Sequence, residues 1–491
     1  MKINCNSWLA KKTLSIWKKN SKKIYFYEKE KSFKASDLLD KIEILDKKIN
    51  KKYYKKSVVF MNGNNSVDWI CAYLTFKINN FYIVIIPSSI ARSGYKYLLN
   101  LIKPNIIFQS NKIKFYNKNS SLLNLLKKKN ITINPKSSYE FLFTTGTTSF
   151  PKGVCIPEAS FLETSKNLIK ILKQSINDTE LLSMSFSHSF GLTRLRTCLI
   201  NGQKIYVSDG LKNFPEVYNN LIKYNITGLS LVPSAIEIIK LMLKKKIKNI
   251  SPQIKYFEIG SSTLNLNSRK WLKRNFKETI VQHHFGSTEA SRSFFAARGN
   301  KDNLNIKDNW IGKKAKYIKF KLIDPKTNKI NKYFGEIVIS GKNLASGYFC
   351  GESANEKLFK KNYFKTSDIA TYKNNLLYFL GKKNSIINVG GEKILPNEIE
   401  DKIEQIEKVK ISLCGAVKDQ IFGERVSALV VLNKNTSKNR NYVLSEINDK
   451  FLNEPFFKRP KTIKFCNNIE TSSNGKKKRD NNYFKKLLKN K

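Results

Sequence analysis

Short apolar runs alternate with amphipathic stretches along the chain, and this alternation constrains the fold more than any other feature of the sequence. The apolar runs have the length of buried strands, and the stretches between them have the spacing of helices. Regular alternation of this kind is typical of α/β proteins with largely parallel sheets. The predicted strands are Ser57–Met61, Tyr82–Ile86, Asn105–Gln109, Lys204–Ser208, Gly228–Val232 and Tyr256–Ile259, and the predicted helices are Ser66–Phe76, Tyr95–Ile102, Pro215–Tyr224 and Ala235–Lys246.

The pattern changes in the last third of the chain. From Ile318 onward, short β-rich segments separated by turn residues indicate a small β-subdomain. After Gly381, helices and strands are mixed, and the Lys/Asn-rich tail after Asn467 is expected to be mobile. We therefore predict a large N-terminal domain (residues 1–383) of two α/β subdomains and a small β-subdomain. A small, mobile α+β C-terminal domain (residues 384–491) should follow.

The charge of the chain is strongly positive. Its 90 Lys and Arg residues against 38 Asp and Glu give a formal net charge of +52. Such a surface would attract acidic partners, and a non-catalytic nucleotide- or nucleic-acid-binding protein is one reading of it. However, the lysines run from Lys2 to Lys491 without gathering on one segment, so a general compositional bias explains them better than a specific nucleic-acid site.

The cysteines and histidines exclude other classes of protein. The seven cysteines are scattered and form no C-x-x-C pair, which indicates reduced thiols in the cytoplasm rather than disulfides or a zinc site. Three histidines are too few, at this spacing, for a His-based metal site. The most apolar stretch, Phe81–Ile86, is too short to span a membrane, so no membrane span is expected.

The segment Thr144–Val154 carries the strongest chemical signal. It follows the apolar run Phe141–Phe143 and contains five hydroxyl side chains, two glycines and Lys152. Glycines let the backbone approach an anion, hydroxyls and amides donate hydrogen bonds, and lysine supplies charge, so the segment suits a polyphosphate. It is not the G-x-x-x-x-G-K-[ST] phosphate loop, because no hydroxyl follows Lys152.

Four further segments are weaker when each is taken alone. A turn in Phe285–Glu289 could hold a nucleotide and bind Mg²⁺ through its carboxylate. Thr366–Asp368 could accept hydrogen bonds from ribose hydroxyls, although an Asx-type turn explains it equally well. Gly390–Glu400 combines a tight glycine turn with a helix start at a proline, and Ser472–Arg479 reads as a basic tail.

In this order and spacing, the five segments resemble the motifs of the adenylate-forming superfamily, which includes acyl-CoA and aryl-CoA synthetases, firefly luciferase and nonribosomal adenylation domains. The first is similar to the family's T-S-G-T-T-G-x-P-K-G, the second to Y-G-x-T-E and the third to T-G-D. Gly335–Ile337 and Gly347-Tyr348 match two more landmarks, and the resemblance extends from about Ser57 to Arg479.

The resemblance implies an ATP-dependent acid–thiol ligase. Such an enzyme activates a small carboxylic acid as acyl-AMP and passes the acyl group to coenzyme A or to the phosphopantetheine of an acidic acyl carrier protein. The implied ATP-binding residues are Thr144, Thr145, Gly146, Thr147, Thr148, Lys152, Phe285, Gly286, Ser287, Thr288, Asp368 and Lys382. Thr145, Glu289 and Lys476 would be catalytic, with Glu289 holding Mg²⁺ and Lys476 approaching the α-phosphate. The C-terminal domain would then rotate and bring Gly390 and Gly391 to the pantetheine tunnel.

Four residues depart from the family pattern. Ser149 replaces a glycine, and Phe285 replaces a tyrosine but keeps the aromatic face. Lys382 stands where the family usually has arginine, so the planar guanidinium is lost, and Asn388 stands where many members have lysine. The last two changes bear on nucleotide affinity rather than on the fold.

The resemblance also places an acyl pocket. His188 and Phe190 would border it, and Gly260 and Ser261 would form another wall. Amino-acid-activating relatives carry an aspartate near His188, and Ser183–Leu195 contains none, which favours a fatty or aryl acid. Glu258 is expected to point elsewhere. An amino-acid-adenylating ligase of the same superfamily remains an alternative, and the sequence does not decide between coenzyme A and a carrier protein.

Overall fold

The computed structural model divides the chain into two compact units, and each is described by itself. The described residues are 5–49, 57–63, 65–88, 90–116, 119–144, 152–208, 210–211, 213–243, 246–325, 327–350, 355–360, 362–471 and 477–489. The first unit consists of Met1–Lys319 and Ile339–Phe364, and the second of Phe320–Val338 and Lys365–Lys491. Within the described ranges, no helix is long and apolar enough to cross a membrane.

The first unit contains two sheets. In one, the strands follow the order β18 (Gly347–Cys350), β8 (Lys152–Pro157), β7 (Tyr139–Thr144), β4 (Tyr82–Ile86), β3 (Val58–Asn62), β5 (Ile106–Gln109) and β6 (Lys112–Phe115). Strands β3, β4, β5 and β7 run parallel, and β6, β8 and β18 are antiparallel to their neighbours. Strand β4 is buried at every position, as expected of a parallel strand covered on both faces.

The other sheet of the first unit is also mainly parallel. Its order is β15 (Lys313–Lys314), β14 (Phe294–Gly299), β13 (Ile280–Phe285), β12 (Tyr256–Ile259), β11 (Gly228–Leu231), β9 (Thr179–Leu182), β10 (Lys204–Val207), β1 (Ile24–Glu28) and β2 (Lys31–Lys34). Strand β1 runs parallel to β10, with Phe26 opposite Ile205, so the N-terminal segment extends a sheet built from residues far along the chain.

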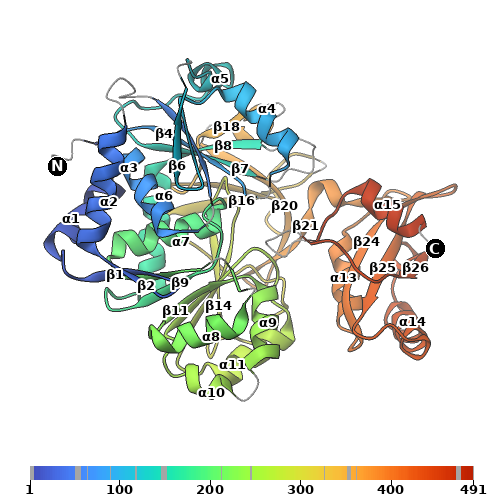
Figure 1. Ribbon diagram of the computed structural model, residues 1–491. Helices are drawn as coiled ribbons and strands as arrows, with labels where there is room; N and C mark the ends of the chain where they lie inside the picture. The colour runs from blue at the N-terminus through green and yellow to red at the C-terminus, as the bar shows by residue number, and fades with distance from the viewer. Residues whose placement is uncertain are drawn as a thin grey trace. The chain divides into compact units, whose positions relative to one another are not determined.

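The helices of the first unit cover these sheets. They are α1 (Trp8–Lys19), α2 (Ala35–Lys48), α3 (Val67–Ile78), α4 (Arg92–Ile102), α5 (Leu122–Lys128), α6 (Glu158–Ile171), α7 (Ser189–Asn201), α8 (Phe214–Lys223), α9 (Pro233–Leu243), α10 (Ile247–Ile250), α11 (Leu266–Asn275) and α12 (Asn355–Leu358). Figure 1 shows α8, α9, α10 and α11 gathered around the strands β11 and β14. Ser66 begins α3 because its side chain accepts a hydrogen bond from the Trp69 amide.

The second unit begins with the strands of the β-subdomain. These are β16 (Ile318–Ile323), β17 (Phe334–Gly341), β20 (Tyr363–Lys373) and β21 (Leu376–Lys382), each with most or all of its residues in this unit. The short strand β19 (Phe359–Lys360) belongs to the first unit, where it pairs with the first two residues of β20, Tyr363 and Phe364. Strands β20 and β21 form an antiparallel hairpin in which Asp368 lies opposite Lys382. The 3₁₀ helix η3 (Lys383–Ser385) follows directly.

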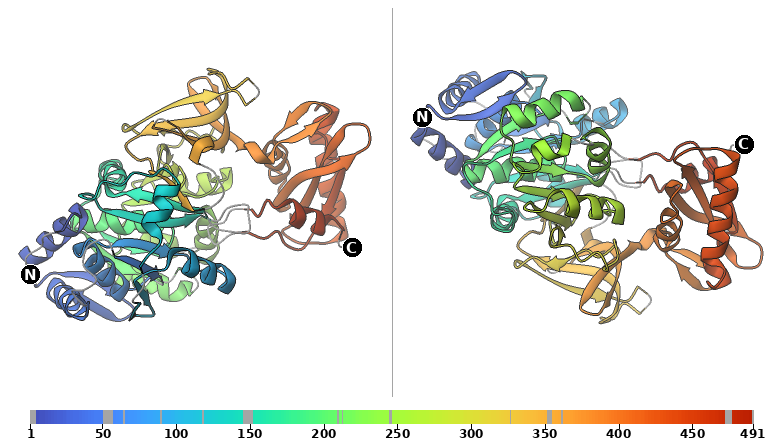
Figure 2. Two further views of the ribbon diagram at one scale, coloured as in Figure 1. Left: turned by 90° about the horizontal axis from the view of Figure 1, so that it is seen from above. Right: turned by 90° about the horizontal axis from the view of Figure 1, so that it is seen from below.

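The remaining elements form an α+β group with its own core, drawn in orange and red in Figure 2. They are β22 (Ile387–Val389), β23 (Glu392–Ile394), α13 (Pro396–Glu404), β24 (Val409–Asp419), β25 (Gly423–Leu432), α14 (Ser437–Phe451), η4 (Phe456–Lys458), β26 (Thr462–Phe465) and α15 (Asn481–Lys489). One buried apolar cluster extends from Ile387 to Val443, Ile447 and Phe451, with Phe465 packed against it. The predicted boundary at residues 383/384 stays a prediction, and this separate core is consistent with it.

The fold confirms the predicted α/β class, and many elements lie where the sequence placed them. The strands predicted at Tyr82–Ile86 and Tyr256–Ile259 have those bounds, whereas the helix predicted from Ala235 begins earlier, at Pro233. Proline suits the first turn of a helix because its missing N–H would have no partner there. The mobile tail predicted after Asn467 is wrong for residues 477–489: α15 buries Phe484, whose ring lies so close to Gly415 that a Cβ there would be 2.6 Å from it.

Candidate active site

The described ends of the phosphate-binding segment predicted at Thr144–Val154 lie on two paired strands. Strands β7 and β8 are antiparallel, with Thr144 directly opposite Lys152. Strand β7 runs parallel to β4, so Thr144 stands at the carboxyl end of a parallel sheet, where α/β proteins bind ligands. The rest of the predicted phosphate-binding set falls outside the described residues, namely Thr145, Gly146, Thr147 and Thr148.

Tyr348 connects the first predicted motif with the second. The ammonium of Lys152 lies 5.8 Å from the centre of the Tyr348 ring, and the Tyr348 hydroxyl donates a 2.5 Å hydrogen bond to Glu289 Oε1. Strand β18 carries Tyr348 beside β8, with Tyr348 opposite Val154. The structure therefore brings the predicted phosphate lysine and the predicted magnesium ligand to the same aromatic side chain.

The surroundings of Glu289 suit a magnesium ligand. Glu289 is buried. Burial, and then the neighbouring Glu289 carboxylate, raise the pKa of Tyr348, so the phenol stays protonated and donates its hydrogen bond to Glu289. The described residues contain no group of three or more His, Cys, Asp or Glu side chains that could hold a metal. Mg²⁺ bound to a nucleotide takes most of its ligands from phosphates and water, so one oriented carboxylate fits it.

The turn after β13 positions Glu289. A Cβ on Gly286 would lie 2.4 Å from the Arg292 amide nitrogen, so this close approach requires glycine. The Ser287 amide donates to the Ala290 carbonyl, and the Ala290 amide donates to the Ser287 hydroxyl, which closes the turn around Thr288. Strand β13 is parallel to β12, so Phe285 also stands at a carboxyl strand end.

Two predicted walls of the acyl pocket meet at His284, a residue that the sequence did not single out. The rings of Phe190 and His284 pack edge to face, 4.8 Å apart. A Cβ on Gly260 would lie 2.1 Å from His284 Cε1, so the imidazole occupies the space over this glycine. Ser261 follows Gly260 with φ +87°, and the half-buried His188 precedes α7 with its pKa lowered by burial.

Glu258 lies beside His284 in a network of buried charges. Its Oε1 accepts a 2.7 Å hydrogen bond from Arg292 Nε and lies 2.8 Å from His284 Nδ1. Its Oε2 lies 3.4 Å from Arg194 Nε, and Arg194 also pairs with Glu180 at 2.8 Å. Burial alone would raise the pKa of Glu258, but Arg292 and His284 hold it well below its usual range. The Glu258 carboxylate is therefore already paired within the protein.

The predicted ribose-binding residue lies in the second unit. Asp368 is buried, and its Oδ1 lies 2.5 Å from the Lys382 ammonium. Lys382, which stands where the resembled family usually has arginine, is thus the ion-pair partner of Asp368. The Asp368 amide donates to the Thr366 hydroxyl, which itself donates to the Ile337 carbonyl. Ser367 sits between them at φ +59°, and its amide donates to Glu336.

The Gly390-Gly391 pair forms the turn between β22 and β23. Both glycines have positive φ, +58° and +95°, and no atom lies within 4 Å of a Cβ built on Gly391. The Asn388 side chain accepts from the Gly391 amide, which gives this asparagine a role in the turn. Lys476, the predicted catalytic lysine, falls outside the described residues.

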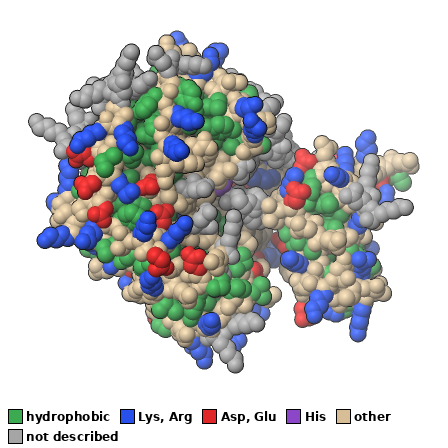
Figure 3. All heavy atoms as spheres, viewed as in Figure 1, with side chains coloured by type: hydrophobic (Ala, Val, Ile, Leu, Met, Phe, Trp, Pro, Cys, Tyr) green, Lys and Arg blue, Asp and Glu red, His purple; other side chains and the backbone are tan. Residues whose placement is uncertain are grey.

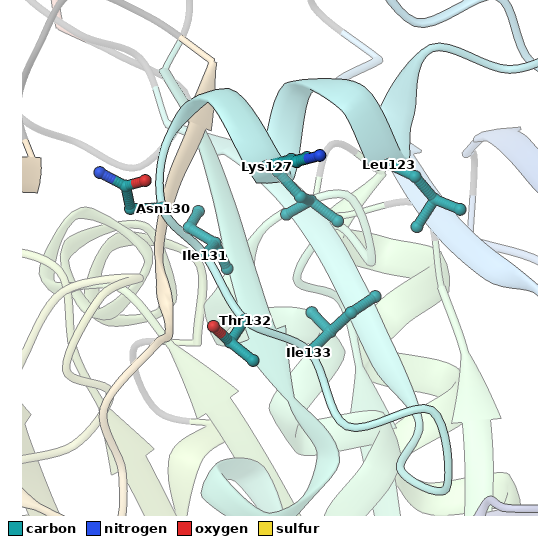
Figure 4. Close-up of a pocket in the computed structure, with 7 residues that line it drawn as sticks. Leu123, Lys127, Asn130, Ile131, Thr132 and Ile133 are labelled. Atoms are coloured by element: carbon teal, nitrogen blue, oxygen red, sulfur yellow. The ribbon is translucent and has the colours of Figure 1, made fainter.

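Among the described residues, neither the cavity beside α5 nor the charge on the face shown in Figure 3 marks a second site. A cavity of about 310 Å³ beside α5 is lined by Leu123, Leu126, Lys127, Asn130, Ile131, Thr132 and Ile133, none of which is a predicted site residue (Figure 4). The lysine and arginine side chains are spread over the face shown in Figure 3.

Comparison with known proteins decides the family. Residues 48–349 match the family model described as AMP-binding enzyme. The chain belongs to this family. The match includes the hairpin of Thr144 and Lys152, the Glu289 turn and Tyr348, and it confirms the resemblance that the five motifs indicated.

Relatives of this AMP-binding enzyme include several CoA ligases. A probable CoA ligase of Humulus lupulus is 24% identical over 349 residues, 70% of this chain and 66% of that protein. The oxalate–CoA ligase of Saccharomyces cerevisiae is 26% identical over 341 residues, 68% of this chain and 61% of that protein. The chain thus spans slightly less than two thirds of these two relatives.

Solved structures of AMP-binding enzymes share the fold. The o-succinylbenzoate CoA synthetase of Bacillus subtilis, in complex with its acyl-adenylate intermediate, superposes with a TM-score of 0.79 and 17% identity, covering 98% of both chains. ATP-bound MatB of Rhodopseudomonas palustris gives a TM-score of 0.79 and 16% identity, covering 96% of this chain and 99% of that one.

Proposed function

We propose that this AMP-binding enzyme activates a carboxylic acid with ATP, releases pyrophosphate, and transfers the acyl group from acyl-AMP to a thiol. One observation carries the proposal: Lys152 and Glu289 meet at Tyr348, at the carboxyl ends of parallel strands. A cation for phosphate and a carboxylate for magnesium are thereby placed together, as nucleotide activation requires. Relatives named as CoA ligases support the second step.

In the first step, a carboxylate oxygen of the substrate attacks the α-phosphorus of ATP, and the bond to the β-phosphate breaks. Two anions must approach each other, so positive charge has to be in place before the reaction. Lys152 and the hydroxyls of the Thr144–Thr148 segment would bind the departing phosphates, and Asp368 would bind the ribose. Magnesium, held by Glu289 when bound, would screen the phosphate charge.

The second step transfers the acyl group from AMP to sulfur. The thiol attacks the carbonyl carbon of acyl-AMP, the bond to the AMP oxygen breaks, and AMP leaves. We propose coenzyme A as the acceptor, because several of the relatives are named as CoA ligases. The Gly390-Gly391 turn, open on the side of Gly391, would contact the pantetheine arm. The alternative acceptor is an acidic carrier protein, whose phosphopantetheine carries the same arm.

The proposed substrate is an acid without an α-amino group, fatty or aryl. A buried ammonium needs a carboxylate partner, and Glu258 is already committed to Arg292 and His284. The names of two relatives, oxalate–CoA ligase and 2-succinylbenzoate–CoA ligase, also refer to acids without an amino group. We place the reaction in the cytoplasm, in keeping with the unpaired cysteines, all of which are described and most of which are buried.

ATP–pyrophosphate exchange tests the proposal. The full chain is assayed with acetate, dodecanoate, benzoate, oxalate, 2-succinylbenzoate, alanine and phenylalanine, each with Mg²⁺. Exchange with one or more of the first five supports the proposed substrate class. Exchange with an amino acid alone would overturn the proposed substrate class but would still support adenylation of a carboxylic acid. Lys476→Ala should abolish adenylation and leave thioester formation from supplied acyl-AMP largely intact; a variant that adenylates at the normal rate would disprove the role of this lysine.

A further inference from the structure

A buried carboxylate in α13 holds the chain segment that follows Lys476. Glu400 is 1% exposed and accepts hydrogen bonds from both ends of the Arg479 guanidinium, 2.7 Å to Oε1 and 2.6 Å to Oε2. Lys477 donates to the same Oε2 at 2.7 Å, and the Cys414 amide donates to Oε1 at 2.8 Å. Two-point pairing of this kind fixes orientation as well as distance.

The charges of this cluster balance. Lys477 also pairs with Glu404 at 2.7 Å, so two carboxylates face two cations. Burial alone would raise the pKa of Glu400, but the two cations lower it to about 2, and the carboxylate stays ionised near neutral pH. A buried charge that loses its partner is strongly unfavourable, so Glu400, Lys477 and Arg479 hold one another in place.

The cluster lies directly beside the predicted catalytic position in the chain. Thr471 and Lys477 form an antiparallel bridge, and the Lys478 amide donates to the Glu470 carbonyl at 2.9 Å. Lys476 is bonded to Lys477, whose ammonium is held by Glu400. The turn formed by Gly390 and Gly391 precedes α13 in the chain, with β23 between them.

We propose that Glu400 is a positioning residue for adenylation: by holding Lys477 and Arg479, it fixes the residues that directly follow Lys476 in the chain, the lysine proposed to act at the α-phosphate. The inference rests on the proposed function, since it gives Lys476 its role in the first half-reaction. Glu400 itself touches neither substrate nor nucleotide. Its loss should therefore slow the formation of acyl-AMP and leave the transfer of the acyl group to the thiol unchanged.

A purely structural role would give a different result. If Glu400 only stabilised the C-terminal fold, its removal would impair both half-reactions together, because the Gly390-Gly391 turn belongs to the same group of elements. The ratio of the two half-reaction rates therefore separates positioning from general destabilisation.

The test compares both half-reactions in the full-length protein. Adenylation is followed as pyrophosphate exchange with the acid that the wild type activates fastest, and transfer is followed as thioester formation from that acid's acyl-AMP and coenzyme A. Glu400→Gln and Arg479→Lys should each slow adenylation about 100-fold, as expected for a misplaced catalytic group, with KM for the acid nearly unchanged and transfer within twofold of wild type. Arg479→Lys keeps the positive charge but loses the two-point pairing of the guanidinium with Glu400, so it is informative even if Glu400→Gln does not fold.

Glu470→Gln is the matched control. It removes the ion pair with Lys478 on the same hairpin, where both side chains are about half exposed, so both rates should stay at the wild-type level. Wild-type adenylation by Arg479→Lys, or equal loss of both half-reactions, would overturn the positioning role. A wild-type protein that forms no acyl-AMP with any acid would instead refute the proposed function.

Discussion

The phenol of Tyr348 donates a 2.5 Å hydrogen bond to the carboxylate of Glu289, although 59 positions of chain separate the two residues. The pairing of β18 with β8 carries the tyrosine there, and the Ala345 amide donates to the Glu289 backbone carbonyl at 2.8 Å. Glu289 is thus fixed through both its side chain and its backbone, which limits the directions in which its carboxylate can bind a cation.

Tyr348→Phe should weaken magnesium binding without removing a metal ligand. Losing a hydrogen bond to a buried carboxylate should lower the free energy of unfolding by about 2 kcal/mol. The Mg²⁺ concentration for half-maximal pyrophosphate exchange should rise about tenfold, as for other residues that orient a metal ligand. Tyr333→Phe, at a tyrosine that is 70% exposed, is the control and should change neither quantity. An unchanged Mg²⁺ requirement in Tyr348→Phe would contradict the proposed role of Glu289.

Ser367→Gly should stabilise the protein. Ser367 has φ +59° in the turn before Asp368, a conformation that glycine adopts without the steric penalty of a Cβ. We expect a gain of up to about 1 kcal/mol in the free energy of unfolding, measured by urea titration. Ser367→Ala keeps the Cβ and should give no gain. Equal stabilisation by both variants would show that backbone strain is not the cause.

The ion pairs of Glu400 should make the second unit sensitive to acid. Its pKa falls from an ordinary value of 4.5 to about 2, so the native state favours the ionised form. The associated stability, about 3 kcal/mol, is fully present above pH 4.5 and is lost as the pH falls toward 2. The difference in unfolding free energy between wild type and Glu400→Gln should therefore shrink over this range. A difference that stays constant from pH 6 to pH 2.5 would exclude Glu400 as the titrating group.

Removal of residues 384–491 should leave a folded fragment with little overall activity. The buried cluster of the removed segment begins at Ile387 and draws all its members from beyond the cut. The fragment retains the Glu289–Tyr348 pair and should still bind ATP, with a sharp thermal transition as the measurement of folding. A fragment that aggregates or lacks a cooperative transition under all buffer conditions would place the boundary elsewhere.

Local patterns predicted the fold class, and they singled out segments whose residues the structure brings together at Tyr348. The apolar run of β4 and the glycine turn before Glu289 can each be predicted from a few neighbouring residues. By contrast, the sequence marks Tyr348 only as a family landmark, because its contact with Glu289 depends on strand pairing between distant segments. His284 remained unassigned for the same reason, since Phe190 and Gly260 approach it from other elements.

Charge was the least predictable feature. In a chain with 90 basic residues, nothing in the local sequence distinguishes Lys477 and Arg479 from the rest of a basic tail. Their pairing with a buried carboxylate becomes visible only when α13 and residues 477–479 are brought together. Arg194 is the exception: an arginine within the largely buried helix α7 requires a buried acid, which the structure supplies as Glu180.

The pairing of β1 with β10 has a consequence for synthesis of the chain on the ribosome. Phe26 lies opposite Ile205, so about 180 further residues must be translated before the N-terminal strand, already paired with β2, can pair with β10. At roughly 5–20 residues per second, the wait is on the order of 10 to 35 seconds. Throughout that time Tyr25 and Phe26, which are buried in the finished protein and lie on opposite faces of β1, lack the neighbours that the later strands supply. The N-terminal segment can therefore complete its part of this sheet only late in synthesis, although it is made first.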